Sequence, residues 1–442
     1  MNTRIDNLLK LAENTVAYGR KKGANQIEVL ISEGNEFSVD VREGNIERLV
    51  EAASKELSLK VIVDQKTASA SSSDLSEDTL RRLVENAVER ARLASADPNS
   101  ILPEKVDVTT DGIKLRLFDP KIPELTPEYK ILAAKQTEKI CLADPRVRKS
   151  YGASFGSTVG GVHLVNSNGF SGSYSRSGCS CGVYLQAGEG DNLIDEGWFD
   201  SSIHIDSLMN PEALAKKAVH RVTRLIGARK IDTQNVPVVF EQPMTDELLG
   251  FLYRCVAGNG IYLRQSFLAD KLNTKIGNER ITVVDDGLIP GAPGSRPFDR
   301  EGVPTRKTVV IEKGILRNYL LDTYSARKLR TQSTGNASGA NNFHMEAGTS
   351  TPDDIVRTVD KGLFLTGTIG FGLVPTTGDI SRGAFGLWIE KGEIAFPVAE
   401  ITISGNLGQI LNNVELVGND LEFKRPITGP TIKVAEMTIG GK

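Results

Sequence analysis

Histidine is scarce in this chain. The 442 residues contain four, namely His163, His204, His220 and His344. A hydrolytic zinc site usually needs three protein ligands, mostly histidine, and an open position for water. No two of these histidines lie one helical turn apart, and His220, the only one on an expected helix, has Lys216 and Arg224 four positions away. The sequence therefore lacks the usual pattern of a zinc hydrolase, and His220 is interpreted as part of a solvated helix surface.

Long apolar runs and cysteines are also few. No stretch of about 18 apolar residues occurs, which argues against a membrane-spanning helix. Residues 1–23 fit an amphipathic helix better than a signal peptide, and four cysteines are too few for a disulfide framework. The formal net charge of −3 disfavours a protein that coats nucleic acid, because phosphate binding needs a basic surface. We expect a cytoplasmic protein that binds neither membrane nor nucleic acid.

Motifs of nucleophilic and phosphate-binding sites are missing too. No G-x-S-x-G pentapeptide occurs, and the glycine-rich run Gly367–Gly372 lacks the lysine of a phosphate-binding loop. Cys179 and Cys181 lie on one face of an expected strand, because strand side chains alternate. They could begin a metal site with His163 or His204. Two small side chains packed in a sheet explain the same pattern, and we prefer that interpretation.

Glycine, by contrast, is abundant, with 43 residues that favour hairpins and close backbone approach. Alternating apolar residues predict antiparallel strands over 26–70 and 146–206. In the second half, Lys313-Gly314 and Lys391-Gly392 each predict a tight turn between two strands. Apolar residues at helical spacing predict helices over 3–22, 76–91, 127–143, 210–227 and 245–257.

The predicted fold class is α+β, in two domains, because 442 residues are too many for one ordinary core. Helices are concentrated in the first half, where we expect them to pack on an antiparallel sheet. The second half is expected to be mainly antiparallel β with a few helices. The composition changes at 226–236, which predicts an N-terminal α+β domain of residues 1–228 and a β-rich domain of residues 229–442.

Several segments of the second half occur together in a recognisable order. They are 294–306, 333–338, 370–384, 400–407 and 417–421. With these segments the chain resembles the TldD/PmbA family, which is related to metallopeptidases and was once called the gyrase modulators, and it is most similar to the PmbA or TldE branch. The resemblance extends more loosely over the first half, including Glu196–Phe199.

The resemblance implies a two-domain α+β fold and a dimer that encloses a cavity accessible to peptides. Catalytic members carry an HExxxH motif on the helix that opens the second domain, and a late cysteine ligand. The corresponding helix here, Thr245–Val256, contains no histidine. The last cysteine of the chain is Cys255, and Gly418-Asn419 stands in the region of the late ligand. We therefore expect no metal and no catalytic residue in this chain, with zinc only in a catalytic partner.

The leading hypothesis is a non-catalytic subunit of a TldD/TldE-type metallopeptidase complex that processes or degrades unfolded peptides. A TldD-type subunit would supply the zinc. The residues that we predict to contact the peptide or the partner are Arg296, Asp299, Arg306, Asp379, Ser381 and Arg382. The segments that contain these residues are rich in Gly, Pro and Asp, and turn formation explains that composition equally well.

Two alternatives stay open. One is a self-contained hydrolase whose site is built from scattered groups such as Cys179, Cys181 and His204. The other is a homodimeric protein that binds peptides or regulates another enzyme. Activity that is sensitive to chelation or to Cys181→Ala would favour the hydrolase, and a lasting homodimer would favour the regulatory protein.

Overall fold

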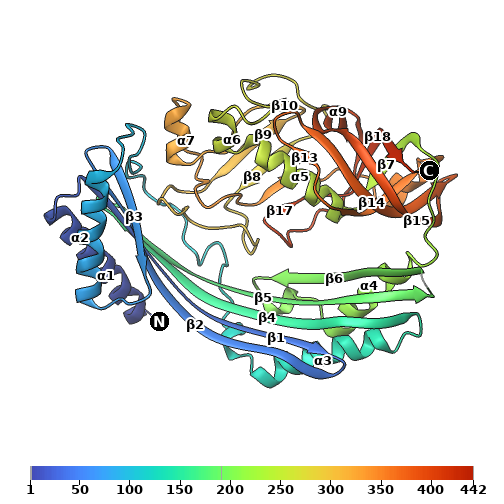
Figure 1. The fold of residues 1–442 in the computed structure, drawn as a ribbon, viewed down its shortest axis with the longest axis horizontal. Helices are drawn as coiled ribbons and strands as arrows, with labels where there is room; N and C mark the ends of the chain where they lie inside the picture. The colour runs from blue at the N-terminus through green and yellow to red at the C-terminus, as the bar shows by residue number, and fades with distance from the viewer. Residues whose placement is uncertain (1, 191, 442) are drawn as a thin grey trace.

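The computed structural model describes residues 2–190 and 192–441, with only the backbone described for residues 2–5 and 192. The first half of the chain forms a long curved sheet, and the second half lies over its inner face (Figure 1). The second half is mainly strands with short helices. The predicted α+β class is thereby confirmed.

The long sheet has six strands in the order β3-β2-β1-β4-β5-β6, and all neighbours are antiparallel. Its first hairpin turns at Glu43-Gly44, where both φ angles are positive, at 51° and 74°. This is the backbone conformation that a two-residue hairpin turn requires. The strands are β1 (Gln26–Arg42), β2 (Asn45–Val63), β3 (Lys66–Ser72), β4 (Val147–Asn166), β5 (Ser171–Glu189) and β6 (Asn192–Ser202).

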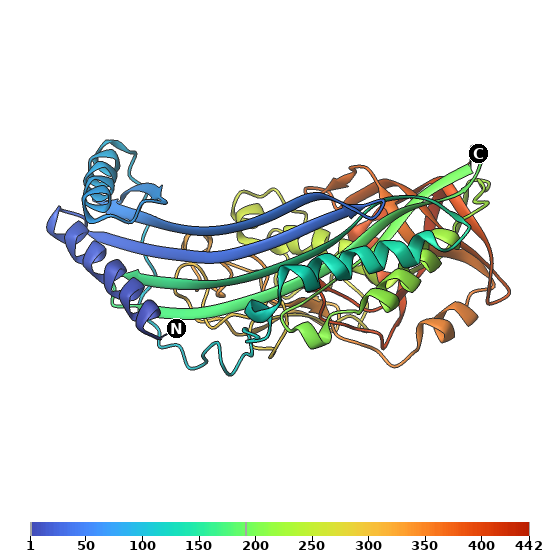
Figure 2. The ribbon, with the colours of Figure 1, turned by 90° about the horizontal axis from the view of Figure 1, so that it is seen from below.

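Helices cover the outer face of this sheet. At one end, Ile27, Val29 and Ile31 of β1 are fully buried against α1 (Asn2–Lys21) and α2 (Glu77–Leu93). At the other end lie α3 (Pro127–Leu142) and α4 (Pro211–Thr223), and Figure 2 shows α3 across the sheet seen from below. The Asn210 side chain accepts a hydrogen bond from the Ala213 amide and thereby caps α4. Two short 3₁₀ helices, Ile122–Glu124 and Ile205–Ser207, flank this layer.

The second half contains two further sheets. The five-stranded sheet has the order β10-β9-β8-β11-β17, and the seven-stranded sheet runs β12-β7-β18-β15-β14-β13 with β16 on β18. An additional pairing of β12 with β14 closes five of these strands into a ring. The strands are β7 (Gln234–Phe240), β8 (Val283–Asp286), β9 (Lys307–Glu312), β10 (Ile315–Leu316), β11 (Phe343–Met345), β12 (Lys361–Ile369), β13 (Leu373–Val374), β14 (Asp379–Glu390), β15 (Glu393–Asn406), β16 (Val414–Val417), β17 (Ile427–Thr428) and β18 (Ile432–Gly440).

One helix of the second half matters most for the site. α5 (Gln242–Val256) buries Leu249, Phe251 and Leu252 in the largest core cluster. The shorter helices are α6 (Gly258–Tyr262), α7 (Thr323–Lys328), α8 (Pro352–Arg357) and α9 (Leu407–Asn412). Among the helices of the described residues, none has both the length and the apolar character needed to cross a membrane.

The sheets divide along the chain near the predicted domain boundary. The six-stranded sheet uses no described strand after Ser202, and the other two sheets use none before Gln234. Sheet membership does not show that each part folds alone. The division into residues 1–228 and 229–442 therefore stays a prediction.

An aromatic cluster joins the two halves. Phe298, in the segment between β8 and β9, is buried against Phe170 of the β4–β5 turn and Tyr174 of β5, with ring centroids 5.0 and 5.2 Å apart. Nearby, the Arg176 guanidinium donates a hydrogen bond to the Pro293 carbonyl. The 294–306 segment thus contacts the first half of its own chain.

We expect Phe298→Ala to destabilise the chain by about 3–4 kcal/mol, because it removes a buried ring and leaves a cavity. Urea unfolding followed by tryptophan fluorescence and circular dichroism measures this loss. Phe371→Ala is the matched control, since the Phe371 side chain is fully exposed, and should cost less than about 0.5 kcal/mol. Equal losses for the two variants would show that the Phe298 contact does not hold the halves together.

Candidate functional site

A cleft of about 770 Å³ lies between the two halves of the chain. One wall comes from β5, β6 and α4, and the other from α5, β12, β14 and β15. Phe199 and Ile369 on opposite walls keep about half or more of their side chains exposed, at 54% and 62%. The lining includes the apolar residues Leu193, Ile194, Trp198, Phe199, Met244, Ile369, Phe385 and Ile401 and the charged residues Asp195, Glu196, Arg221, Glu247, Glu400 and Arg425.

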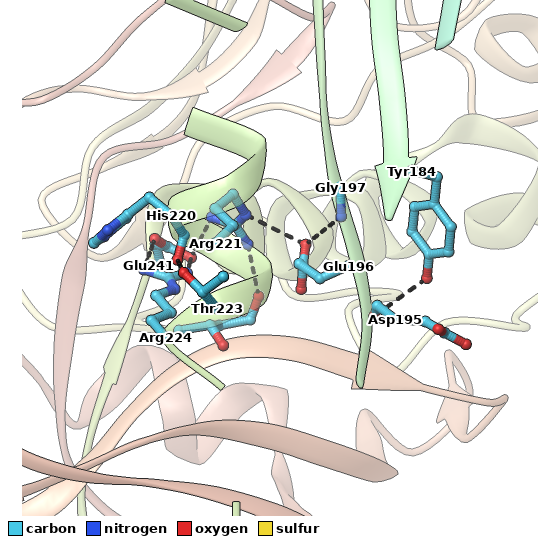
Figure 3. A network of polar contacts seen from close by, with 10 residues as sticks. Tyr184, Asp195, Glu196, Gly197, His220, Arg221, Thr223, Arg224 and Glu241 are labelled. Atoms are coloured by element: carbon cyan, nitrogen blue, oxygen red, sulfur yellow. Dashed lines mark hydrogen bonds and ion pairs between the residues drawn. The ribbon is translucent and has the colours of Figure 1, made fainter. Parts of the chain in front are cut away.

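A buried ionic network lies at the base of the cleft (Figure 3). Arg221 of α4 is only 5% exposed. Its guanidinium lies 3.3 Å from the Glu196 carboxylate of β6 and 2.8 Å from that of Glu241, and it donates to the Thr366 carbonyl of β12. Arg224 donates two further hydrogen bonds to Glu241, at 3.0 and 2.9 Å. The network therefore ties α4 and β6 to the start of α5 and to β12.

Each charged group of this network favours the charged form of its partner. Burial acts to raise the pKa of Glu241, but attraction to Arg221 and Arg224 outweighs burial and leaves this pKa below its ordinary value. Burial likewise opposes the charge of Arg221, yet Glu241 and Glu196 hold its pKa above the ordinary value. The Trp198 ring lies 4.9 Å from the Arg221 guanidinium carbon and 3.9 Å from the Lys217 ammonium. The base of the cleft is thus charged, paired and largely shielded from water.

α5 places one carboxylate in the cleft, that of Glu247. Its Oε2 accepts a hydrogen bond of 2.6 Å from Arg382 Nη1 on β14 and another of 2.6 Å from Thr368 Oγ1 on β12. The Arg382 Nε also donates to the Gly370 carbonyl. Because the guanidinium neutralises the carboxylate, Glu247 is engaged with protein groups and not left open for a ligand cation.

The residues around the cleft do not fit a zinc ion. Among the described residues that line it there is no histidine and no cysteine. Across residues 2–190 and 192–441, no group of three or more His, Cys, Asp or Glu side chains has an arrangement that could hold a metal. Zinc in a peptidase needs three protein ligands, and the Glu247 carboxylate is paired with Arg382.

The predicted contact residues of the 294–306 segment have structural partners. Asp299 is 1% exposed and accepts hydrogen bonds from the Glu301, Val303 and Ala337 amides. Burial raises the pKa of Asp299 to about 6. The Arg296 guanidinium donates to backbone carbonyls, among them Ala340. Arg306 is exposed but donates to the Ser333 carbonyl.

The other three predicted contact residues, Asp379, Ser381 and Arg382, lie at the start of β14 in the seven-stranded sheet. Asp379 is exposed, and it accepts hydrogen bonds from Thr377 Oγ1 at 2.6 Å and from Asn406 Nδ2 at 2.9 Å. Ser381 is exposed and pairs with Ser404 of β15. Arg382 reaches the cleft through Glu247. The structure thus brings Asp379, Ser381 and Arg382 together on one strand, and it places Arg296, Asp299 and Arg306 around another loop.

The groups of the hydrolase alternative lie in the first half. The Cys179 and Cys181 thiols are buried in β5, and burial raises the pKa of each thiol to about 12. They donate to the Ser202 and Met209 carbonyls. His204 Nε2 lies 2.9 Å from the Arg116 carbonyl. Thiols with such pKa values are protonated near neutral pH, which disfavours them as nucleophiles or metal ligands.

Family comparisons cover almost the whole chain. Residues 27–91 match the model of PmbA/TldA metallopeptidase domain 1, residues 120–226 that of the central domain, and residues 233–441 that of the C-terminal domain. The chain is 33% identical to the metalloprotease PmbA of Escherichia coli O157:H7 over 428 residues, which is 97% of this chain and 94% of that protein.

Two further proteins are similar to this chain over nearly its full length. The metalloprotease PmbA homolog of Haemophilus influenzae is 33% identical over 430 residues, which is 96% of this chain and 94% of that protein. A crystal structure from Bacteroides thetaiotaomicron, described as a candidate modulator of DNA gyrase, superimposes with a TM-score of 0.92 at 29% identity and covers 98% of both chains. The architecture and the sequence therefore point to one group of proteins.

Proposed function

The chain belongs to the TldD/PmbA metallopeptidase family, and from this premise we propose that it is a non-catalytic, metal-less subunit of a TldD/TldE-type metallopeptidase complex. In this proposal a TldD-type partner supplies the zinc, and the complex processes or degrades unfolded peptides. The observation that carries the proposal is the ion pair between Glu247 of α5 and Arg382 of β14, at 2.6 Å. This helix is the one on which, by the family resemblance, catalytic members carry HExxxH.

The chemistry of this pair argues against a metal. A single carboxylate cannot hold zinc, and this one already accepts hydrogen bonds from Arg382 and Thr368. A guanidinium beside the carboxylate also adds positive charge where a cation would have to bind. Glu247 is thus paired within the protein, although its side chain is 43% exposed.

The cleft suits an extended peptide better than a compact polar ligand. Its walls carry the partly exposed side chains of Phe199 and Ile369, and an apolar lining with a few polar groups is typical of ligand clefts. The short β13 ends the hydrogen-bonded path of its sheet, and strand edges bind peptides through backbone hydrogen bonds. Asp379, Ser381 and Arg382 on the neighbouring β14 are the contact residues that this proposal favours.

Four buried and unpaired cysteines support a reducing compartment, and we propose the cytoplasm. The remaining predicted contact residues, Arg296, Asp299 and Arg306, bind backbone groups of loops in their own chain. We therefore assign them a structural role in this proposal, which leaves the cleft and β14 as the peptide-facing surface.

The proposal is tested by purifying this chain and a TldD-type chain separately and together. We expect no stoichiometric zinc in this chain by elemental analysis and no cleavage of casein by it alone. Casein cleavage should appear when the two chains are mixed, and a chelator should abolish it. Stoichiometric zinc in this chain, or chelator-sensitive cleavage by it alone, would contradict the proposal.

Two variants connect that activity to the cleft. Phe199→Ala should lower the activity of the mixed chains several-fold, because it removes an apolar contact on the cleft wall. Leu93→Ala, which changes an even more exposed apolar side chain outside the cleft, is the control and should leave the activity unchanged. A lasting homodimer that never binds the TldD-type chain would instead favour the homodimeric regulatory alternative.

A further inference from the structure

A second cavity lies at the opposite end of the long sheet, where its inner face meets the loops of the second half. Its volume is about 720 Å³. One wall consists of residues of β1, β2 and β3, and the other contains Arg300, Glu301, Asp322 and Ala337. The first wall is formed by Glu28, Leu30, Glu56, Ser58, Leu59, Lys60, Ser69, Ala70 and Ser71.

Strand alternation explains why this wall is polar. Ile27 and Val29 of β1 point to the helices on the outer face, so Glu28 between them points to the inner face. Lys60 of β2 is the partner of Glu28 in the strand register, and Ser69 of β3 is the partner of Lys60. A row of polar side chains therefore crosses the sheet beneath the second half.

Glu28 is the unusual member of this row. Its Oε2 is buried and has no hydrogen-bond partner among the described residues. Burial raises the pKa of Glu28 to about 8, and the charges of Glu301 and Asp299 act in the same direction, against Lys60 and Arg300. A buried carboxyl oxygen without a hydrogen-bond partner destabilises the folded chain whether or not the carboxyl is protonated. A site that keeps such a group is therefore a candidate for binding something that supplies the donor.

The charges of the lining indicate which donor fits. Four carboxylates, of Glu28, Glu56, Glu301 and Asp322, line the cavity together with the cationic groups of Lys60 and Arg300. The Glu301 and Asp322 carboxylates also accept hydrogen bonds from backbone amides at the start of α7. Within the described residues these acids do not form a metal-holding group. An ammonium group carries one positive charge and three N–H donors, so it can bind scattered carboxylate and hydroxyl oxygens at hydrogen-bond distance.

We propose that this cavity binds a ligand with a primary ammonium group, and that the Glu28 carboxylate is the counter-ion of that group. The ammonium can belong to the amino terminus of a peptide or to a free polyamine. The inference depends on the Glu28 cavity alone. It holds whether or not the chain is a peptidase subunit.

Binding at this site is coupled to a proton. At pH 7 the free Glu28 is mostly protonated, so an incoming ammonium displaces its proton to the solvent and leaves an ion pair. The charged groups that face Glu28 are Lys60 and Glu56 from β2, and Asp299, Arg300, Glu301 and Asp322 from the second half. With the Glu28 pKa at about 8, we expect spermidine to release about one proton on binding at pH 7 and less at pH 9. A peptide amino terminus has a pKa of about 8 and must itself take up a proton to bind as an ammonium at pH 9.

Isothermal titration calorimetry of the full chain in buffers of different ionisation enthalpy measures both the binding of the ammonium ligand and the release of the proton. The probes are spermidine, a lysine-free peptide with a free amino terminus, and the same peptide acetylated. We expect spermidine or the free peptide to bind and the acetylated peptide not to bind. Whichever of the two binds more tightly identifies the source of the ammonium group.

Glu28→Gln should weaken this binding by about tenfold or more and abolish the proton release. Glu36→Gln is the matched control, because Glu36 is an exposed carboxylate on the same strand and the same face but outside the cavity. Both variants should keep the circular dichroism spectrum of the unchanged chain. Absence of binding by all three probes, or equal binding by the Glu28→Gln variant and the unchanged chain, would overturn the proposal.

Discussion

Replacing Arg221 with methionine is expected to destabilise the folded chain by about 3–5 kcal/mol, because it removes the buried cation that the Glu196 and Glu241 carboxylates share. Arg221 contacts Glu196 and Glu241 from a position that is 5% exposed, and it also donates to the Thr366 carbonyl. Methionine keeps most of the volume of the arginine stem, so lost charge pairing accounts for most of the effect. Because the network joins α4 and β6 to α5 and β12, the walls of the cleft should loosen together.

Urea unfolding followed by circular dichroism measures this loss. The matched control is Arg357→Met at the exposed Arg357–Asp354 pair of α8, which should cost less than about 1 kcal/mol. Adding Glu241→Gln to Arg221→Met should cost less than the sum of the two single changes, because the contact between these two side chains can be lost only once. A loss below about 1 kcal/mol for Arg221→Met would mean that the network does not hold the two halves together.

The second large effect is expected at Asp285. This carboxylate is fully buried in β8, and it accepts hydrogen bonds from the Asn336 side chain at 2.7 Å and from the Asn341 amide and side chain at 2.8 Å each. Burial raises the pKa of Asp285, although the surrounding donors oppose that rise. Asp285→Ala leaves several buried donors without an acceptor, and we expect a loss of about 3–5 kcal/mol.

Differential scanning calorimetry of the Asp285→Ala chain should show a lower unfolding temperature than that of the unchanged chain. Asp206→Ala provides the control, since Asp206 is exposed and its ion pair with Lys121 is of the kind that contributes at most about 1 kcal/mol. Asp285→Asn keeps the size and one acceptor oxygen, so its loss should fall between those of the other two variants. An unfolding temperature unchanged in Asp285→Ala would contradict the structural role of this carboxylate.

Local signals in the sequence predicted much of the fold. Lys313-Gly314 and Lys391-Gly392 each have two positive φ angles between paired strands, which confirms the tight turns. The helix expected to begin after Asn210 begins at Pro211, because proline and the capping side chain act within one turn. These features depend on a few neighbouring residues, so the sequence contains all the information needed to predict them.

The candidate site was harder to predict. Asp299 and Arg296 are predicted contact residues, and both bind the backbone of the 333–342 segment. Residues that stabilise a loop and residues that bind a ligand look alike in a sequence. Arg221 was not singled out, because an arginine on an expected helix usually faces solvent. The one sequence feature near this network was the segment Glu196–Phe199, which resembles the family, and nothing in that segment indicates that Glu196 pairs with an arginine.

The sequence by itself determined the α+β class, the hairpin turns, the family and the absence of an HExxxH motif, because each of these depends on residue identity or on spacing along the chain. Only the tertiary structure decided which charges are buried and what they face. Glu28 meets the loop of Glu301, and Glu247 meets Arg382, across more than a hundred residues. Whether a side chain is buried depends on surfaces that distant segments form together, so the residues next to it in the sequence do not indicate its burial.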